Sequence, residues 1–339
     1  MGINDIWYIL FVVIISGYLI LDGFDMGVAV LHLFVARNDG ERRVTLNSIG
    51  PVWDGNEVWI VLGGGALFAA FPLVYASLFS GFYSAMMLVL LVMILRTCAL
   101  EFRSKRPGYG WRALWDVVFA ASSFGLALLL GVAFGNIVSG MPIDAAGDMR
   151  ITLIEMLNPF AVLVGVTAVV MVTMHGALYL EMRTEAEVQK RVKRAIPALM
   201  LVFAVLIALV VLATLLFRPH LVTNYQNNIW PVIFPLAAVI ALATAWRKQS
   251  AGKYVSAFVA SAAMIALTVT TAAAGMFPNM LISTTDPLFD LTIYNAASAP
   301  NTLTIMLVIA LLGMPIVLAY TAAVYFIFRG KFKLDTHSY

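Results

Sequence analysis

Long apolar runs, separated by short polar segments, follow one another along almost the whole chain. About twenty apolar residues are enough for a helix to cross a bilayer, and by this criterion the pattern predicts nine membrane-spanning helices. Their expected limits are 6–35, 52–75, 78–101, 113–138, 159–182, 196–217, 229–246, 254–277 and 302–328. The fold class predicted from the pattern is therefore an all-α polytopic membrane protein.

Composition supports this interpretation. Hydrophobic residues make up 62% of the 339 residues and charged residues 12%, whereas soluble domains contain about 25% charged residues. The single cysteine, Cys98, lies within an apolar run, so the chain has no disulfide framework. The loops between the predicted helices are short, which excludes a large soluble domain.

The basic residues indicate how the chain is oriented. Eighteen of the 21 Lys and Arg residues fall on alternate segments, namely those after the first, third, fifth, seventh and ninth predicted helices. Arg150 and Arg218 are the exceptions on the opposite side, and Arg96 lies within a helix. Because short cytoplasmic loops carry the excess of Lys and Arg, we expect the N-terminus outside and the C-terminus in the cytoplasm. The same bias explains these charges without nucleic-acid binding.

Four acidic residues interrupt the first two apolar runs. Asp22 and Asp25 lie in the inner part of the first helix, and Asp54 and Glu57 lie at the start of the second. A charged side chain at the bilayer centre costs at least about 2.5–3.5 kcal/mol, so such residues are functional candidates by default. Each pair is spaced i, i+3 and so shares a helix face. We expect four carboxyls at similar depth, open to the cytoplasm.

Carboxyls in this position are expected to hold or relay protons, because desolvation and like-charged neighbours favour the protonated form. For Asp54 a simpler role is equally open, since acids in the first turn stabilise a helix. Two ion pairs are also expected at the inner helix ends, Arg96 with Glu101 and Arg112 with Asp116.

Other residues around the acids fit helix packing. Gly23, Gly27 and Gly55 permit close approach of neighbouring helices, and Trp53 fits the interfacial aromatic belt. His175 lies in the inner part of the fifth predicted helix. A haem ligand, a proton relay and a hydrogen-bonded core histidine are all open for it. No Cys or His spacing matches a zinc, iron–sulfur or c-type haem site.

Several motifs together carry a resemblance to one family. They include Asp22-Gly23-Phe24-Asp25-Met26-Gly27, Trp53-Asp54-Gly55-Asn56, Gly64-Gly65-Ala66-Leu67-Phe68-Ala69-Ala70-Phe71-Pro72 and Ala133-Phe134-Gly135-Asn136, with Leu157-Asn158-Pro159-Phe160 and Met276-Phe277-Pro278 further on. In these motifs, and over nearly its whole length, the chain resembles subunit II of the cytochrome bd-type quinol oxidases.

The resemblance implies a fold of two four-helix bundles plus one helix. On this basis residues 1–140 would form the first bundle, with the acid-bearing hairpin at 6–76, and 141–280 the second. Residues 281–339 would supply an outer loop, the ninth helix and a cytoplasmic tail. The outer segments, about 139–158 and 278–301, are expected to form caps or a docking surface.

The resemblance also implies a function. The chain would be the haem-free subunit of a respiratory complex of the bacterial cytoplasmic membrane. A haem-bearing subunit I, with two haems b and one haem d, would oxidise quinol and reduce O2 to water with protons from the cytoplasm. The family associates the aspartate of the Trp-Asp-Gly-Asn motif, here Asp54, with the subunit interface and proton delivery, and Asp25 is its expected companion. A structural quinone or lipid and a small single-helix accessory subunit complete these expectations.

Two alternatives from other classes also fit the residues. Membrane acids and glycine-rich helices suit a proton-coupled secondary transporter, which would work alone or as a homodimer. A haem-binding electron-transfer subunit would use His175 and would show a visible spectrum as an isolated chain.

Overall fold

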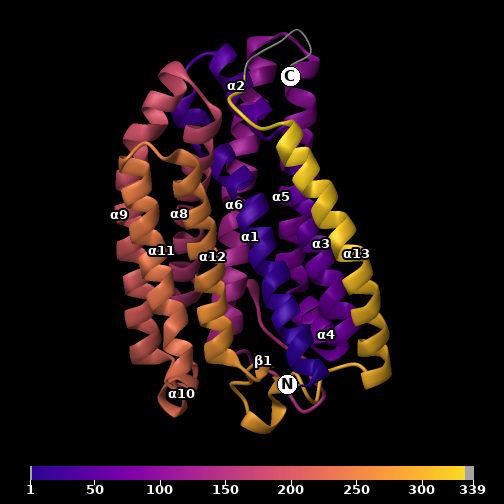
Figure 1. Cartoon of the computed structure of the whole chain (residues 1–339). Coiled ribbons are helices and arrows are strands. Elements are labelled where there is room, and N and C mark those ends of the chain that lie inside the picture. Colours follow the sequence, from indigo (N-terminus) through magenta and orange to yellow (C-terminus); the bar gives the residue numbers. More distant parts are fainter. Residues whose placement is uncertain (1, 333–339) are drawn as a thin grey trace.

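The computed structural model describes residues 2–332, so Lys333, one of the basic residues of the tail, lies outside the described part. The chain forms one elongated bundle of helices that run roughly parallel to a common long axis (Figure 1). The N-terminus and the strand β1 (Asn279–Leu281) lie at one end, here called the β1 end. The helix α2 (Asp39–Ile49) lies at the other, called the α2 end.

The first half of the chain supplies one side of the bundle. Its helices are α1 (Ile3–Val35), α3 (Trp53–Ala70), α4 (Pro72–Gly81), α5 (Tyr83–Phe102), α6 (Tyr109–Ser139) and the short α7 (Leu153–Met156). The helix α1 runs through the middle of the molecule and packs against α3 and α6.

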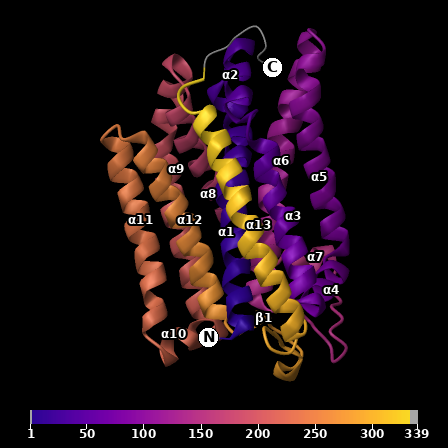
Figure 2. The same ribbon diagram turned by 45° about the vertical axis from the view of Figure 1, so that its right-hand side comes forward.

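The second half supplies the other side. Its elements are α8 (Pro159–Arg183), α9 (Ala186–Phe217), α10 (His220–Asn227), α11 (Ile233–Ser250), α12 (Tyr254–Met276), β2 (Leu291–Thr292) and α13 (Pro300–Ile327). The helix α8 packs against α1, α6, α9 and α12. Figure 2 shows α13 lying obliquely over α1, between α12 and α3.

The all-α class predicted from the sequence is confirmed, and eight described helices are long and apolar enough to cross a membrane. The helix expected at 52–75 is wrong in one respect, because it is broken into α3 and α4 between Ala70 and Pro72. Proline has no N–H for the helical ladder and clashes with the preceding turn. The next helix consequently begins at Tyr83 instead of residue 78.

Two further differences arise where helices carry charge. The helix α9 begins at Ala186, ten residues before the expected limit, because the charged segment before its apolar run is also helical. The helix α2 was not predicted at all, since it is too polar to appear as an apolar run. Asn38 caps it by accepting a hydrogen bond from the Glu41 N–H at 2.9 Å, a common way to begin a helix.

The tightest helix contact in the core joins α1 to α8. A Cβ atom built on Gly27 would lie 1.9 Å from the carbonyl oxygen of Val172, and one built on Gly176 would lie 2.5 Å from the backbone of Gly27. Both distances are far below van der Waals contact. Glycine is therefore required at both positions for the helices to approach this closely, which is the packing role expected for Gly27. Gly23, one turn earlier, meets only the Val172 side chain at 3.5 Å.

The two outer segments close the β1 end together. Met141 N–H donates to the Ile282 carbonyl at 2.8 Å, and Thr284 N–H donates to the Met141 carbonyl at 2.9 Å. Ser298 N–H donates to the Ala70 carbonyl at 2.9 Å, which ties the second segment to the carbonyl that the break at Pro72 leaves without its helical partner. The polar residues of these segments thus satisfy backbone groups instead of forming a separate domain.

The α1–α8 crossing predicts a strong effect of Gly27→Ala. The added methyl group cannot fit against the Val172 carbonyl, so the helices must separate, at a cost of about 1–3 kcal/mol or more. We expect a lower thermal unfolding temperature and a lower yield of folded protein from membranes. Gly110→Ala is the control, because a Cβ atom there meets nothing within 4 Å. Equal stability of the two variants would contradict the packing argument.

Candidate functional site

Asp22 is neutralised by an arginine from another helix. Arg96 of α5 donates from Nη1 to Oδ2 of Asp22 at 2.9 Å and from Nη2 to Oδ1 at 2.5 Å. Both residues are 0% exposed. The planar guanidinium matches both carboxylate oxygens, so this pair links α1 to α5. The expected pairing of Arg96 with Glu101 is wrong.

Asp25, one turn further along α1, has a different environment. Its Oδ2 accepts a hydrogen bond from Nδ2 of Asn56 at 2.7 Å, and Oδ1 of Asn56 accepts one from the Tyr325 hydroxyl at 2.8 Å. Asp25 is 0% exposed, and its Oδ1 atom has no hydrogen-bond partner among residues 2–332. The site therefore holds one buried carboxyl that is paired with a cation and one that accepts a hydrogen bond from an amide, which in turn accepts one from a tyrosine hydroxyl.

The two acids of α3 lead from this cluster to the surface. Glu57 is half-buried, and its Oε2 lies 4.0 Å from Nη1 of Arg96. Asp54, one turn earlier, is exposed and does not enter the cluster. Of the four carboxyls expected at similar depth, Asp54 is thus the one that lies outside the buried group, on the exposed surface of α3.

The exposed face of α3 continues beyond Asp54. Gly55, Gly64 and Gly65 would each meet nothing within 4 Å if they carried a Cβ atom, and Val61 and Phe68 on the same helix are 67% and 61% exposed. A methyl group at Gly55 would thus meet no other side chain or helix among residues 2–332. Trp53, at the start of α3, is half-buried and packs against the main apolar core.

A second polar network lies at the α2 end. Asp116 of α6 is buried and accepts hydrogen bonds from Arg42 at 2.7 Å and from Nε of Arg103 at 2.5 Å. Arg112 donates instead to Asp39 at 2.7 Å, so the expected Arg112–Asp116 pair is wrong. The network joins α2 to the ends of α5 and α6.

Glu41 adds a link from α2 to α9. Arg191 lies 2.6 Å from Oε1 of Glu41, and the Arg37 N–H donates to Oε2 at 2.6 Å. Burial raises the pKa of Glu41, but these hydrogen bonds together outweigh burial and hold the pKa below its ordinary value. Ion pairs thus connect α2 to α9 at the α2 end.

The histidines of the long helices α1 and α8 already have protein partners on both ring nitrogens. His175 contacts the Ser261 hydroxyl at 2.7 Å through Nδ1 and the Ile20 carbonyl at 3.1 Å through Nε2. His32 contacts Thr45 at 2.6 Å and Asp116 at 2.7 Å. A haem iron needs a free imidazole nitrogen, so neither ring, as placed, fits an axial ligand. The described residues also contain no group of three or more His, Cys, Asp or Glu arranged to hold a metal ion.

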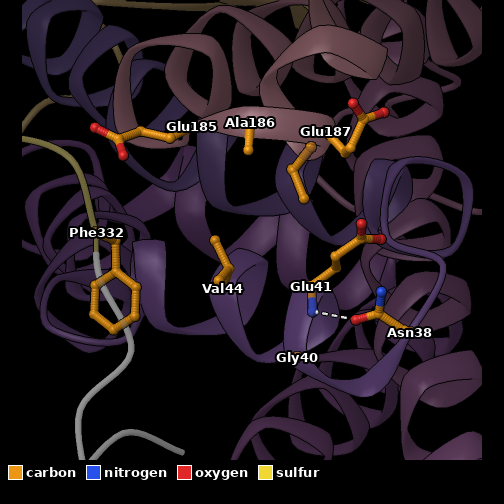
Figure 3. A pocket seen from close by; sticks show the side chains of 9 residues that line it. Asn38, Gly40, Glu41, Val44, Glu185, Ala186, Glu187 and Phe332 are labelled. Atoms are coloured by element: carbon orange, nitrogen blue, oxygen red, sulfur yellow. Dashed lines mark hydrogen bonds between the residues drawn. The ribbon is translucent and has the colours of Figure 1, made fainter.

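A cavity of 550 Å³ opens at the α2 end, between α2 and the start of α9 (Figure 3). Three glutamates line it, but each pairs with a basic residue: Glu41 with Arg191, Glu187 with Lys190 and Glu185 with Lys331. Figure 3 shows the three glutamate side chains around the opening. Each glutamate that lines this cavity in the described part of the chain is thus paired with a basic residue.

The geometry defines what the buried site can do. Asp25 can gain or lose a proton at its unpartnered oxygen, while the adjacent Asp22 is already paired with Arg96. Glu57 and Asp54 continue a line of acids along α3 toward an exposed face. Intramembrane carboxyls arranged in this way are typical of proton pathways in multi-pass membrane proteins.

Sequence reasoning missed two members of the site, Arg96 as the partner of Asp22 and Tyr325. A lone arginine in an apolar helix signals a buried acidic partner, but it does not say which one. Tyr325 lies 269 residues after its partner Asn56, and nothing in the local pattern of α13 distinguishes it.

The chain matches known proteins over almost its full length. Residues 3–328 fit the family model of cytochrome bd terminal oxidase subunit II. The chain is 37% identical to cytochrome bd-I ubiquinol oxidase subunit 2 of Escherichia coli K12, over 98% of this chain and 97% of that one. It is 34% identical to cytochrome bd ubiquinol oxidase subunit 2 of Bacillus subtilis, over 97% of each chain. A bd oxidase structure from Geobacillus thermodenitrificans shares the fold, with a TM-score of 0.77 and 15% identity, over 97% of this chain and 99% of that one.

The fold and the buried acids define a multi-pass, all-helical membrane subunit with ionisable groups at membrane depth. The chain belongs to the cytochrome bd terminal oxidase subunit II family. It is thus a subunit of a quinol:oxygen oxidoreductase of the respiratory chain, which implies a haem-bearing subunit I as its partner. Family membership decides against the secondary-transporter alternative.

The Asp22–Arg96 pair predicts a steep cost for removing one partner. Asp22→Asn or Arg96→Gln alone should destabilise the protein by about 3–5 kcal/mol, because a buried charge is left without a counter-charge. The double variant should lose less than the sum of the two. Thermal unfolding of the purified complex measures both effects. Glu101→Gln is the control on the same helix, and a loss as large as that of Asp22→Asn would contradict the assigned pairing.

Proposed function

We propose that this chain is the haem-free subunit of the oxidase and that it supplies cytoplasmic protons for the reduction of O2 to water in subunit I. The observation that carries this proposal is Asp25, a fully buried carboxyl with no cation paired to it and one oxygen unpartnered among the described residues. Asp22 and Arg96 neutralise each other beside it. A proton can therefore bind at Asp25 without breaking an ion pair.

The proposal requires a definite topology. We propose nine crossings, with α3 and α4 together making one of them, the N-terminus outside and the α2 end in the cytoplasm. In this arrangement α1, α3, α5 and α6 form one four-helix bundle, α8, α9, α11 and α12 form the other, and α13 is the ninth helix. The eight apolar helices and the alternation of basic segments support it, and the cytoplasmic membrane of a bacterium is the location that fits this charge bias.

In the proposed function, the subunit contributes to the movement of charge in one direction across the membrane. Protons consumed in water formation would enter from the cytoplasm, whereas quinol oxidation would release its protons outside. Each charge moved in this way works against a potential worth about 2.3 kcal/mol per 100 mV. The chain needs no redox group of its own for this role, which agrees with the full hydrogen-bond sets of His175 and His32. The proposal places two haems b and one haem d in subunit I.

The exposed face of α3 is the surface that we propose for subunit I. It combines Asp54 with three glycines whose Cα atoms are open to the surroundings. Lipid solvates an exposed carboxylate poorly, whereas small residues allow a partner helix to approach closely. Covering this face would leave Asp54 between the two subunits, one turn from Glu57. A small single-helix accessory subunit and a structural quinone or lipid remain predictions from the family resemblance.

The proton role predicts slower turnover after Asp25→Asn or Asp54→Asn. Each change removes a titratable oxygen from the proposed route, so oxygen uptake with quinol should fall by about 10²-fold or more, the lower range for loss of a proton-transferring side chain. Haem content, measured from the visible spectrum, should stay at the wild-type level. Glu187→Gln, an exposed acid of the α2 end, is the control. Wild-type oxygen uptake by fully assembled Asp25→Asn and Asp54→Asn complexes would refute the proton role.

The exposed face of α3, proposed as the surface for subunit I, predicts a separate effect. Gly65→Trp would place a large ring between α3 and subunit I, so we expect loss of co-purification of the two subunits. Val239→Trp on α11 is the matched control, because Val239 is 67% exposed on the opposite side of the bundle and is expected to face lipid. Retention of the two-subunit complex by Gly65→Trp would exclude this face as the interface.

A further inference from the structure

Asn56 lies between Asp25 and Tyr325, and these three side chains come from α3, α1 and α13. Asn56 is 1% exposed, Asp25 is 0% exposed and Tyr325 is half-buried. The two hydrogen bonds of 2.7 Å and 2.8 Å form one continuous chain from the tyrosine hydroxyl to the carboxyl. A single helix–helix contact would need neither the amide nor the hydroxyl, so the arrangement calls for a chemical explanation.

The chemistry of the three groups allows two complete hydrogen-bond patterns. An ionised Asp25 only accepts hydrogen bonds, so the Asn56 amide turns its NH2 group toward it, and Oδ1 of Asn56 then accepts from the Tyr325 hydroxyl. A protonated Asp25 can donate instead, once its carboxyl group rotates to bring the protonated oxygen toward Asn56. If the amide turns over, its oxygen accepts from Asp25 and its NH2 group donates to the oxygen of Tyr325. Only a hydroxyl can serve as donor in one pattern and acceptor in the other.

Tyr325 also lies on the side from which protons would arrive. It lines a cavity of 320 Å³ at the α2 end together with Tyr179 and Arg183. Pro51, Arg329 and Gly330 line the same cavity and are exposed. The cavity is thus open to the surroundings on one side and reaches the tyrosine on the other. The space is large enough for several water molecules, each of which occupies about 30 Å³ in the liquid.

The remaining groups around Asp25 have fixed roles. Asp22 on α1 is paired with Arg96 of α5, and Glu57 on α3 lies 4.0 Å from the same guanidinium. The hydroxyl of Tyr179 on α8 donates a hydrogen bond to the Ser48 carbonyl at 2.7 Å. Asn56 and Tyr325, which are linked to Asp25 by hydrogen bonds within residues 2–332, are therefore the pair that can rearrange when a proton is gained.

We propose that Asn56 and Tyr325 form an amide switch that accommodates both protonation states of Asp25, with Tyr325 as a positioning residue. A hydronium ion gives its proton to Asp25, which becomes a carboxylic acid while the donor becomes water. The Asn56 amide then turns over, and the Tyr325 hydroxyl changes from donor to acceptor. Release of the proton reverses the pattern. This inference rests on the proposed function, since it gives the switch its role in proton delivery.

The test is Tyr325→Phe in the intact two-subunit oxidase. Phenylalanine keeps the ring but can complete neither pattern, so oxygen uptake should fall between about twofold and tenfold, the effect of one lost hydrogen bond. The solvent deuterium isotope effect on turnover should rise, because the proton step becomes slower, while haem content stays unchanged. Tyr320→Phe on the same helix is the matched control, as Tyr320 is 70% exposed. It should leave turnover and isotope effect unchanged.

Double variants separate the switch from a structural role. Asp25→Asn cannot change protonation state, so adding Tyr325→Phe to it should cause no further loss. Asn56→Leu should reproduce the Tyr325→Phe loss and should not add to it. Multiplicative losses in either double variant, or a loss of haem content that accounts for the lower rate, would overturn the switch.

The outcomes also distinguish this inference from the proposed function. Wild-type turnover of Asp25→Asn would remove the proton role itself. Slow turnover of Asp25→Asn combined with identical turnover and isotope effect for Tyr325→Phe and Tyr320→Phe would overturn the switch alone. If Tyr325→Phe fails to assemble, Asn56→Leu carries the test with the same readouts.

Discussion

The contact between the backbones of α1 and α8 at Gly27 and Gly176 sets the geometry of the rest of the molecule. With no Cβ atoms in between, one helix from each half of the chain touches the other directly, and other helices of the bundle pack against both. Asp22 and Asp25 precede this crossing by five and two residues. Their depth and direction are therefore fixed by a backbone contact, which is stiffer than any side-chain contact that could have been used instead.

A rigid α1 explains why the polar residues can be buried at all. The free energy of placing charge at membrane depth is recovered only when partners are held at hydrogen-bond distance. Arg96 reaches Asp22 from α5, and Asn56 reaches Asp25 from α3. At the α2 end the network around Asp116 fixes α2, α5 and α6 in the same way. Hydrogen bonds and ion pairs thus fix the positions of the surrounding helices relative to α1, while close packing at small and apolar residues holds the helices together.

The sequence was sufficient for the helical class and for identifying Asp22 and Asp25 as buried acids, because both follow from hydropathy and charge along the chain. It was not sufficient to predict the direction in which each side chain points from its helix. The i, i+3 rule puts Asp54 and Glu57 on one side of α3, but only tertiary packing decides that Asp54 faces outward. The partner of Arg96 was assigned wrongly for a related reason: a long guanidinium side chain can reach a neighbouring helix as easily as the next turn of its own. Tyr325 is beyond any local pattern.

The position of α13 connects assembly to the chemistry of the site. Leu303 is the one fully buried residue of this helix, so its apolar surface is mostly uncovered within the chain, and its main contacts are with α1 and α3. Yet it is α13 that brings Tyr325 to Asn56. In the proposed function, subunit I or lipid would cover the remaining surface of this helix. The hydrogen-bond partner of Asn56, which in turn bonds to Asp25, thus comes from a helix whose surface is mostly uncovered, so in the proposed function assembly with subunit I would also affect the environment of Asp25.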